Sequence, residues 1–282
     1  MSRILLDRHD SPLGQWVRAL CMPDGALAQH VEMLWYVSGS TAFARDRRLP
    51  NGRTHVLFNL GEPQYLFPRD GAPQRFDTSW ISGQQEGFIE TGASGATTLV
   101  GAQLRAHGAY ALFGIDQHEL ADRVVPLEAV CGDAIGTLRQ QLLEAATPHA
   151  CFVLLEHWLL RLLARGRSVH AAIRAAARRL ESAPHALRIA PLSRELGLSR
   201  EHLIRRFRRE IGLTPKTYAN IHRFEHALRL GLTRAAGWGE IAQRCGYYDQ
   251  AHLIRDFRRY AGRAPARLLD SAMPDDASIV VD

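Results

Sequence analysis

The pattern of apolar and polar residues divides the chain into two parts that meet near residue 133. Before it, short apolar runs such as Thr54–Leu60 and Thr97–Leu104 are separated by turn sequences such as Pro50–Gly52. Runs of this length between Gly, Pro, Asn and Asp are typical of β-strands joined by tight turns. The first part is therefore predicted to be β-rich, with short helices at Pro12–Ala19 and Ala109–Phe113.

After residue 133 the apolar residues recur at helical spacing instead. Thr147 is placed to cap a helix that starts at Pro148, and apolar residues follow at three- and four-residue intervals up to Gly166. We expect this long amphipathic helix either to pack on the β-rich part or to pair with a second subunit. A further helix is predicted over 169–181, and helices with short turns continue to about residue 270.

One segment of the helical part occurs twice, fifty residues apart. The two copies are His202–Arg209, followed by Gly212 and Pro215, and His252–Arg259, followed by Gly262 and Pro265. An internal repeat of this kind indicates one supersecondary unit built twice. Each copy reads as a short helix, a turn that contains Gly197 or Gly246, and a basic helix capped by Ser199 or Asp249. This is the layout of a helix-turn-helix, whose second helix enters a DNA major groove.

Each basic helix has one apolar side and one polar side. Leu203 and Phe207 in the first copy, and Leu253 and Phe257 in the second, are predicted to face the core. The residues predicted to face DNA are Glu201, Ile204, Arg205, Arg208, Arg209, Gln250, Ala251, Ile254, Arg255, Arg258 and Arg259. A solvated, salt-linked helix surface is the alternative for such arginines.

The roles within this set differ. We expect Arg205 and Arg255 to contact DNA directly, at base edges or phosphates, and Ile204 to reach a thymine methyl group. The arginines better placed for phosphate are Arg208, Arg209, Arg258 and Arg259. A linker helix is predicted from Pro215 to about Leu230, which spans roughly 25 Å at 1.5 Å per residue. Together with the bodies of the two units, it would set the basic helices about 34 Å apart, one turn of B-DNA.

Charge separates the same two parts of the chain. The formal net charge is +6, but residues 167–270 hold 21 Lys+Arg against 9 Asp+Glu, net +12, which leaves 14 against 20, net −6, elsewhere. This asymmetry predicts a polyanion-binding module joined to a module with another task. At 282 residues the chain is long enough for two domains. The predicted boundaries are 1–166 for a β-rich domain, 167–270 for an all-α domain, and 271–282 for a flexible tail.

The four cysteines argue against a metal centre. Cys21, Cys131, Cys151 and Cys245 are scattered without a C-x-x-C pair, so we predict no metal, no cofactor and a reduced, cytoplasmic setting. The charged N-terminus and the lack of a long apolar run predict no signal peptide and no membrane association. Common catalytic motifs such as G-x-S-x-G and H-E-x-x-H do not occur either, so an enzyme is not predicted.

Residues 187–269 resemble the DNA-binding domain of the AraC/XylS family of transcription regulators. The matching residues of the second unit are Ile241, Ala242, Gly246, Tyr247, Asp249, Ala251, His252, Leu253, Arg255, Phe257, Arg258, Gly262 and Pro265. Tyr218, Arg223, Ala227 and Leu230 match the family's linker helix, whereas Leu268 replaces a usual aromatic residue. The resemblance implies sequence-specific regulation of transcription on double-stranded promoter or operator DNA, with RNA polymerase as a further partner.

The first part is similar to the β-rich sensory domain of one uncharacterised branch of the same family. The segments that carry this similarity are Leu49–Gly52, Phe58–Gly61, Ser82–Gln85 and Glu119–Leu127, whereas Arg105–Gly108 departs from the usual Arg-Pro-Gly-Gly. A barrel-like or jelly-roll-like fold is expected for such a domain. The resemblance implies binding of a small effector or formation of a homodimer.

The β-rich part offers polar residues near predicted strands as effector ligands. These candidates are Arg53, His55, Asn59, Gln84, Arg105 and His107, with Trp35, Tyr36, Phe58 and Trp80 as walls. Ordinary packing within a β-domain is the alternative for each of them.

The sequence thus predicts an α+β, two-domain protein with two helix-turn-helix units joined by a linker helix. Two other functions compete with that of a regulator. Some relatives of this DNA-binding domain accept methyl groups from damaged DNA, but this needs a zinc-bound cysteine cluster that four isolated cysteines do not provide. The second competing hypothesis is a scaffold that acts through protein contacts and has lost DNA binding.

Overall fold

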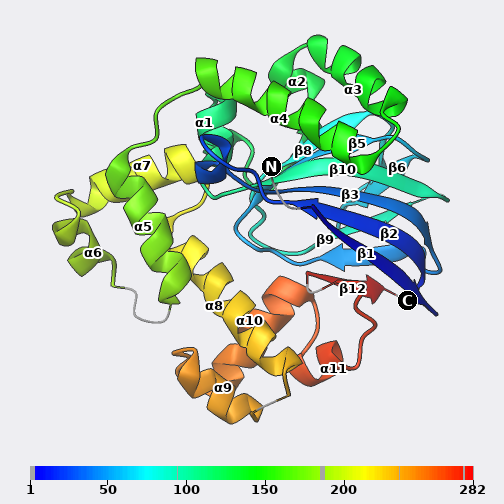
Figure 1. The fold of residues 1–282 in the computed structure, drawn as a ribbon. Coiled ribbons are helices and arrows are strands. Elements are labelled where there is room, and N and C mark those ends of the chain that lie inside the picture. Colours follow the sequence, from blue (N-terminus) through cyan, green and yellow to red (C-terminus); the bar gives the residue numbers. More distant parts are fainter. Residues whose placement is uncertain (1–3, 94, 185–187, 235, 276, 282) are drawn as a thin grey trace.

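The computed structural model describes residues 4–93, 95–184, 188–234, 236–275 and 277–281. A β-rich N-terminal part is followed by a helical C-terminal part (Figure 1), which confirms the predicted α+β fold class.

Two antiparallel sheets form the β-rich part. The larger has the order β1 (Ile4–Ser11), β2 (Gly14–Cys21), β3 (Val31–Thr41), β10 (Thr97–Leu104), β5 (Thr54–Asn59), β8 (Ser79–Ser82) and β11 (Val124–Pro126). The smaller has the order β12 (Ser278–Val281), β4 (Arg45–Arg48), β9 (Ile89–Ala93), β6 (Gln64–Phe67) and β7 (Gln74–Phe76). The described strands pair into two separate sheets, so they do not close into the barrel that was one of the expected forms.

The helix predicted at Pro12–Ala19 is wrong, because these residues belong mostly to strand β2. Their side chains alternate between two faces: Trp16 and Arg18 line a cavity, whereas Ala19 and Cys21 are buried against the sheet's apolar core. This period of two is the signature of a strand with two different faces. The helix at Ala109–Phe113 is confirmed.

Helices cover one face of the larger sheet. They are η1 (Leu27–Gln29), α1 (Gly108–Phe113), α2 (Glu128–Cys131), α3 (Ala134–Glu144) and α4 (Pro148–Arg165), whereas the short helix η2 (Gln117–Glu119) lies against the helical part. The Thr147 hydroxyl accepts a hydrogen bond from the Ala150 N–H at 3.2 Å, so the predicted N-cap of α4 is confirmed. Phe152, Leu155 and Leu159 are buried in the sheet's core, so α4 packs within its own chain.

The C-terminal part is helical as predicted. Its elements are α5 (Ala171–Ser182), α6 (Ile189–Glu195), α7 (Arg200–Ile211), α8 (Pro215–Leu232), α9 (Trp238–Arg244), α10 (Gln250–Ala261) and α11 (Pro265–Leu269). Ser199 and Asp249 cap α7 and α10 by accepting hydrogen bonds from the backbone N–H of His202 and His252, at 3.1 and 2.7 Å. These caps start both basic helices where the sequence predicted.

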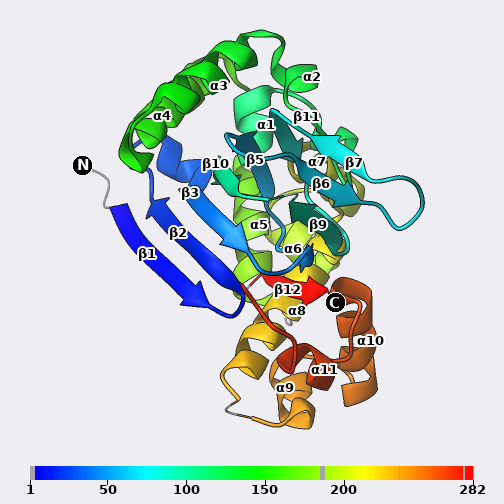
Figure 2. The same cartoon turned by 90° about the vertical axis from the view of Figure 1, so that its right-hand side faces the viewer.

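The segment 271–282 was predicted to be a flexible tail, but residues 278–281 form strand β12 instead. β12 pairs with β4, with Ser278 opposite Arg48 and Val281 opposite Arg45. It forms one edge of the smaller sheet (Figure 2). Ile279 is fully buried in the same apolar cluster as the core of the helical part. The strand therefore joins the two parts of the chain, through backbone hydrogen bonds to one and a side chain buried in the other.

We predict that Ile279→Ala lowers the free energy of unfolding by about 2–5 kcal/mol, because it removes a fully buried side chain at this junction. Urea denaturation of the full-length protein measures the change. The matched control is Leu6→Ala on the exposed strand β1, where Leu6 is 60% exposed and the expected change is small. Equal stability of the two variants would contradict a structural role for β12.

Candidate functional site

Each basic helix follows a short helix and a glycine turn. The turns between α6 and α7 and between α9 and α10 contain Gly197 and Gly246, which have φ values of +66° and +69°. Such a left-handed conformation is cheap only for glycine, so these residues allow the chain to reverse direction between the helices. Two helix-turn-helix units are therefore present.

The apolar sides of both helices are buried as predicted. Leu203, Phe207, Leu253 and Phe257 are all 0% exposed. Of the residues predicted to face DNA, Ile204 and Ile254 are partly buried, and those that are exposed are Glu201, Arg205, Arg208, Arg209, Gln250, Ala251, Arg255, Arg258 and Arg259. The polar side of each helix is thus directed away from its own core.

A buried ion pair fixes the second basic helix on the linker helix. Arg223 of α8 donates to Asp256 of α10 at 2.9 Å, and both side chains are 14% exposed. The Arg223 guanidinium also lies 4.3 Å from the centre of the Tyr247 ring, in the turn before α10. A planar guanidinium held on two sides sets the orientation of α10 more firmly than apolar contact alone.

Carboxylates of the β-rich part reach the C-terminal ends of both basic helices. Arg209 at the end of α7 pairs with Asp116 at 3.0 Å, and Arg259 at the end of α10 pairs with Glu86 at 3.3 Å. Arg209 and Arg259 occupy equivalent positions of the repeat. Two arginines predicted to bind phosphate are therefore already paired within the chain.

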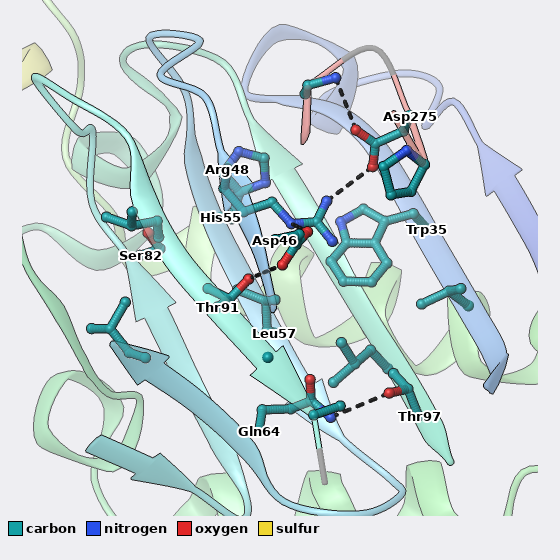
Figure 3. Close-up of a pocket in the computed structure, with 18 of the residues that line it drawn as sticks. Trp35, Asp46, Arg48, His55, Leu57, Gln64, Ser82, Thr91, Thr97 and Asp275 are labelled. Atoms are coloured by element: carbon teal, nitrogen blue, oxygen red, sulfur yellow. Dashed lines mark hydrogen bonds and ion pairs between the residues drawn. The ribbon is translucent and has the colours of Figure 1, made fainter. Parts of the chain in front are cut away.

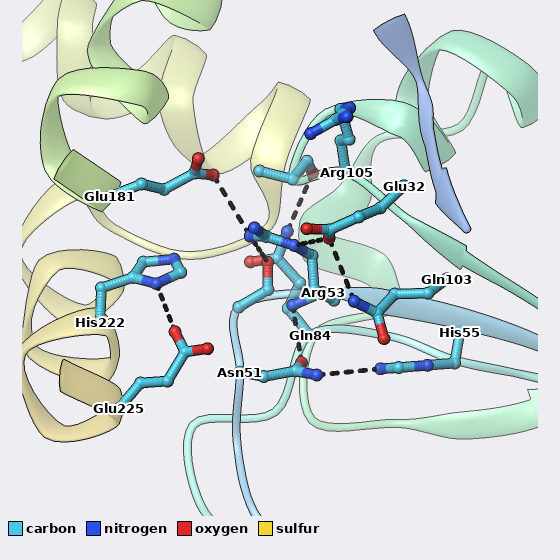
Figure 4. Close-up of polar contacts among 12 residues, drawn as sticks. Glu32, Asn51, Arg53, His55, Gln84, Gln103, Arg105, Glu181, His222 and Glu225 are labelled. Carbon is cyan, nitrogen blue, oxygen red and sulfur yellow. Dashed lines mark hydrogen bonds and ion pairs between the residues drawn. The ribbon is translucent and has the colours of Figure 1, made fainter. Parts of the chain in front are cut away.

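Arg53 joins the two parts of the chain (Figure 4). It donates to Glu32 of β3, to Glu181 of α5 at 3.2 Å and to the Tyr218 hydroxyl of α8 at 3.4 Å, and its side chain is only 13% exposed. Burial alone would raise the pKa of Glu32, but the charge and hydrogen bond of Arg53 hold this pKa below its usual value. Arg53 was a candidate effector ligand, and the structure also gives it these contacts between the two parts.

A cavity of about 490 Å³ lies between the two sheets (Figure 3). Small-molecule sites in proteins are typically about 300–1,000 Å³, with mostly apolar walls and a few polar groups. The walls include the predicted Trp35 and Trp80, together with Leu57 and Leu99. Of the predicted effector ligands, Arg53 and His55 line the cavity.

The other four candidates have structural contacts outside the cavity lining. Asn59 holds a turn by accepting from the Gly61 N–H at 3.0 Å, and Gln84 donates to the Ala106 carbonyl at 2.9 Å. Arg105 donates to the Ala28 carbonyl at 2.8 Å. The ring of His107 packs edge-on against that of His30, with centroids 5.4 Å apart.

Sequence reasoning missed the charged end of the cavity. Arg48 pairs with Asp46 and with Asp275, each at 2.9 Å, and Thr91 donates to Asp46 at 2.6 Å. Burial would raise the pKa of Asp275, but the positive charge of Arg48 and hydrogen bonds from Ser278 and Ala277 lower it. The sequence of β4 is too highly charged to be recognised as a strand, and Asp275 lies more than two hundred residues after Arg48. No local pattern therefore indicated this cluster.

His55 is held neutral at pH 7. Burial lowers its pKa to about 4, and the nearby charges of Arg48 and Arg53 contribute to this shift. The Nε2 atom of His55 lies 3.4 Å from the side-chain amide nitrogen of Asn51.

Among the described residues, no group of three or more His, Cys, Asp or Glu side chains is arranged to hold a metal ion. The described helices include none that is long and apolar enough to span a membrane.

Comparison with known proteins supports the division into two parts. A model described as a helix-turn-helix domain, of the AraC type, matches residues 192–271. The chain carries an AraC-type helix-turn-helix domain. A domain of unknown function, DUF6597, matches residues 20–126.

The chain is also similar to several solved structures. ToxT from Vibrio cholerae is 12% identical with a TM-score of 0.50, and the match covers 81% of this chain and 94% of ToxT. This likeness shows the shared two-domain fold. A probable AraC family transcriptional regulator from Rhodopseudomonas palustris is 26% identical, with a TM-score of 0.33 over 36% of this chain and 96% of that one. The C-terminal domain of the response regulator yesN from Fusobacterium nucleatum is also 26% identical, with a TM-score of 0.33 over 35% and 97% of the two chains. No curated protein matches the chain significantly.

We predict that the protein loses stability as the pH falls from about 6.5 to 4. Burial lowers the pKa of both His55 and His107 to about 4, so in this window the unfolded chain binds more protons than the folded one. Each histidine then reduces the free energy of unfolding by up to about 1.4 kcal/mol per pH unit. Urea denaturation at pH 7 and pH 5 measures the slope, which His55→Gln should reduce. An unchanged slope in that variant would contradict a buried, neutral His55.

Proposed function

We propose that the protein regulates transcription by sequence-specific binding of double-stranded DNA, with α7 and α10 in successive major grooves of one duplex. The observation that carries this proposal is the duplicated helix-turn-helix, with exposed arginines at equivalent positions of both copies. Arg205 and Arg255 lie one turn into their helices, on the side opposite the buried leucine and phenylalanine. In helix-turn-helix proteins this part of the second helix contacts base edges.

The linker helix supports the same geometry. α8 has 18 residues, which corresponds to about 27 Å at 1.5 Å per residue. With the bodies of the two units added, this length agrees with the spacing of about 34 Å between successive major grooves. The net charge of +12 over residues 167–270 supplies attraction for the phosphate backbone.

We further propose that a small effector, bound in the cavity between the sheets, modulates DNA binding. Strand β4 connects the two sites, because Asp46 and Arg48 face the cavity while Arg47 lies on the other side of the strand. Arg47 pairs with Glu90 at 2.8 Å and donates to the Ala261 carbonyl, at the C-terminal end of α10, at 3.4 Å. Homodimerisation through the first domain and contact with RNA polymerase remain predictions from the family resemblance.

We predict that Arg205→Ala and Arg255→Ala each weaken binding of a selected DNA site by about 1–3 kcal/mol if they contact base edges. The site is first selected from random duplexes with the full-length protein, and affinities are then measured by fluorescence anisotropy. The matched control is Arg75→Ala in β7, which removes the same charge from an exposed position in the other part of the chain.

Two outcomes would contradict the proposal. The first is that the wild-type protein shows no salt-sensitive affinity for any duplex. The second is that Arg205→Ala and Arg255→Ala both bind the selected site as tightly as Arg75→Ala does. If variants that do not bind DNA still bind a protein partner, the scaffold hypothesis is favoured instead.

A further inference from the structure

The charges around the cavity are balanced within the protein. Its lining includes the guanidinium groups of Arg18, Arg48 and Arg53. Arg18 pairs with Asp7 at 3.1 Å, whereas Arg48 and Arg53 each pair with two carboxylates. These three arginines are paired with five carboxylates, so the charged groups at the cavity carry no net positive charge that would favour an anion. The buried Nε atom of Arg18 has no hydrogen-bond partner in the described part of the chain.

The remaining polar groups of the lining are neutral. Gln64 and Thr97 lie at the end of the cavity away from Arg48 and Asp275 (Figure 3), with the Gln64 amide 3.4 Å from the Thr97 hydroxyl. Trp35 and Leu57 lie between these two ends in the same view. An anionic ligand would lose its hydration in a cavity whose charged groups carry no net positive charge, and it would meet the carboxylates of Asp46 and Asp275.

We infer that the cavity binds an uncharged, mainly apolar compound that carries a hydroxyl or carbonyl group. Its apolar body lies against Trp35 and Leu57, and its polar group exchanges hydrogen bonds with Gln64 and Thr97. This inference rests on the effector function proposed above and adds the chemical class of the effector. It excludes carboxylates and phosphates as preferred ligands of this cavity.

A matched pair of probes tests the ligand class. 2-Naphthol and 2-naphthoate have nearly the same size, but at pH 7 only the naphthoate is charged. Isothermal titration calorimetry of the full-length protein without DNA should show 2-naphthol binding at least about tenfold more tightly, since an unpaired buried charge costs well over 1.4 kcal/mol.

Two substitutions locate the binding. Leu57→Trp, which fills the cavity, should abolish binding of 2-naphthol, whereas Leu6→Trp on exposed β1 should leave it unchanged. Circular dichroism checks that both variants are folded. Equal or tighter binding of 2-naphthoate, or binding of neither probe, would overturn the inference. The calorimetry contains no DNA. The proposed ligand class can therefore prove wrong while a separate assay still shows that the wild-type protein binds DNA.

A second inference rests on a different observation, the two ion pairs at the ends of the basic helices. Arg209 lies four residues after Arg205, and Arg259 four residues after Arg255, so each pair of arginines shares one helix face. Asp116 and Glu86 therefore lie about one helical turn from the residues proposed to contact DNA. The four side chains of these ion pairs are 29–54% exposed, and pairs with this exposure are weak enough to be exchanged.

We propose that Asp116 and Glu86 compete with DNA phosphates for Arg209 and Arg259. The acidic β-rich part thus withholds one phosphate contact from each helix-turn-helix unit, at equivalent positions. Arg208 and Arg258, which are exposed at the neighbouring positions, are not held in this way by any ion pair among the described residues. This inference also rests on the proposed DNA binding.

The salt dependence of DNA affinity tests this competition. In the double variant Asp116→Asn, Glu86→Gln, Arg209 and Arg259 are free to bind phosphate, and Arg167, which also pairs with Asp116 at 3.3 Å, loses that partner too. The slope of log affinity against log salt concentration should become steeper by about 1.8, which is 0.9 for each phosphate. Affinity at low salt should rise about two- to thirtyfold, as expected when Arg209 and Arg259 no longer have to leave a weak ion pair to bind phosphate.

The control is Asp7→Asn, Asp77→Asn, which removes two negative charges from exposed ion pairs elsewhere in the β-rich part. Its slope should stay close to that of the wild type. Identical slopes for the two double variants would show that only net charge matters and would overturn the competition. Weaker binding by the Asp116, Glu86 variant at all salt concentrations would also overturn it, because the ion pairs would then position the helices for DNA. If the wild type binds no duplex at all, the proposed function fails instead.

Discussion

The arrangement of the two parts of the chain depends on a buried guanidinium. Arg53 is surrounded by Glu32 from the β-rich part and by Glu181 and Tyr218 from the helical part. A buried ion pair of this kind gives little net stability, because the loss of hydration offsets the attraction between the charges. Removing one partner is costly, however, since it leaves an unpaired charge in a poorly hydrated site. The network therefore acts mainly on orientation: the two parts fit together in the one way that satisfies all of these groups.

Strand β4 extends this coupling to the cavity. The alternation of side chains along a strand places Asp46 and Arg48 on the cavity side and Arg47 on the side of α10. A molecule that moves Arg48 or its carboxylate partners also acts on the strand that supports the end of the second basic helix. Because β4 is held between β9 and β12, such a movement would reach the helical part through a hydrogen-bonded sheet rather than through a loop.

The helical part was largely predictable from sequence because its information is local and occurs twice. Ser199 and Asp249 mark helix starts, and the buried leucine and phenylalanine recur at helical spacing in both copies. The β-rich part was harder, because the meaning of a strand residue depends on a partner that is distant in sequence. Strand β2 was read as a helix for this reason, and the strongly charged β4 was not recognised as a strand. The Arg48–Asp275 pair joins residues that no local pattern relates, and the contacts of Arg209 and Arg259 with the β-rich part were equally invisible.

The pairing of β12 with β4 also has a consequence for how the molecule is made. Residues 45–48 are synthesised long before residues 278–281, so the edge of β4 stays open through most of translation. An open edge presents free backbone donors and acceptors to any other extended segment, including one from a neighbouring nascent chain. The four residues Arg45, Asp46, Arg47 and Arg48 are all charged, and charged side chains on an exposed edge disfavour such pairing. The unusual composition of this strand, which hid it from sequence analysis, would also protect the unfinished sheet from aggregation.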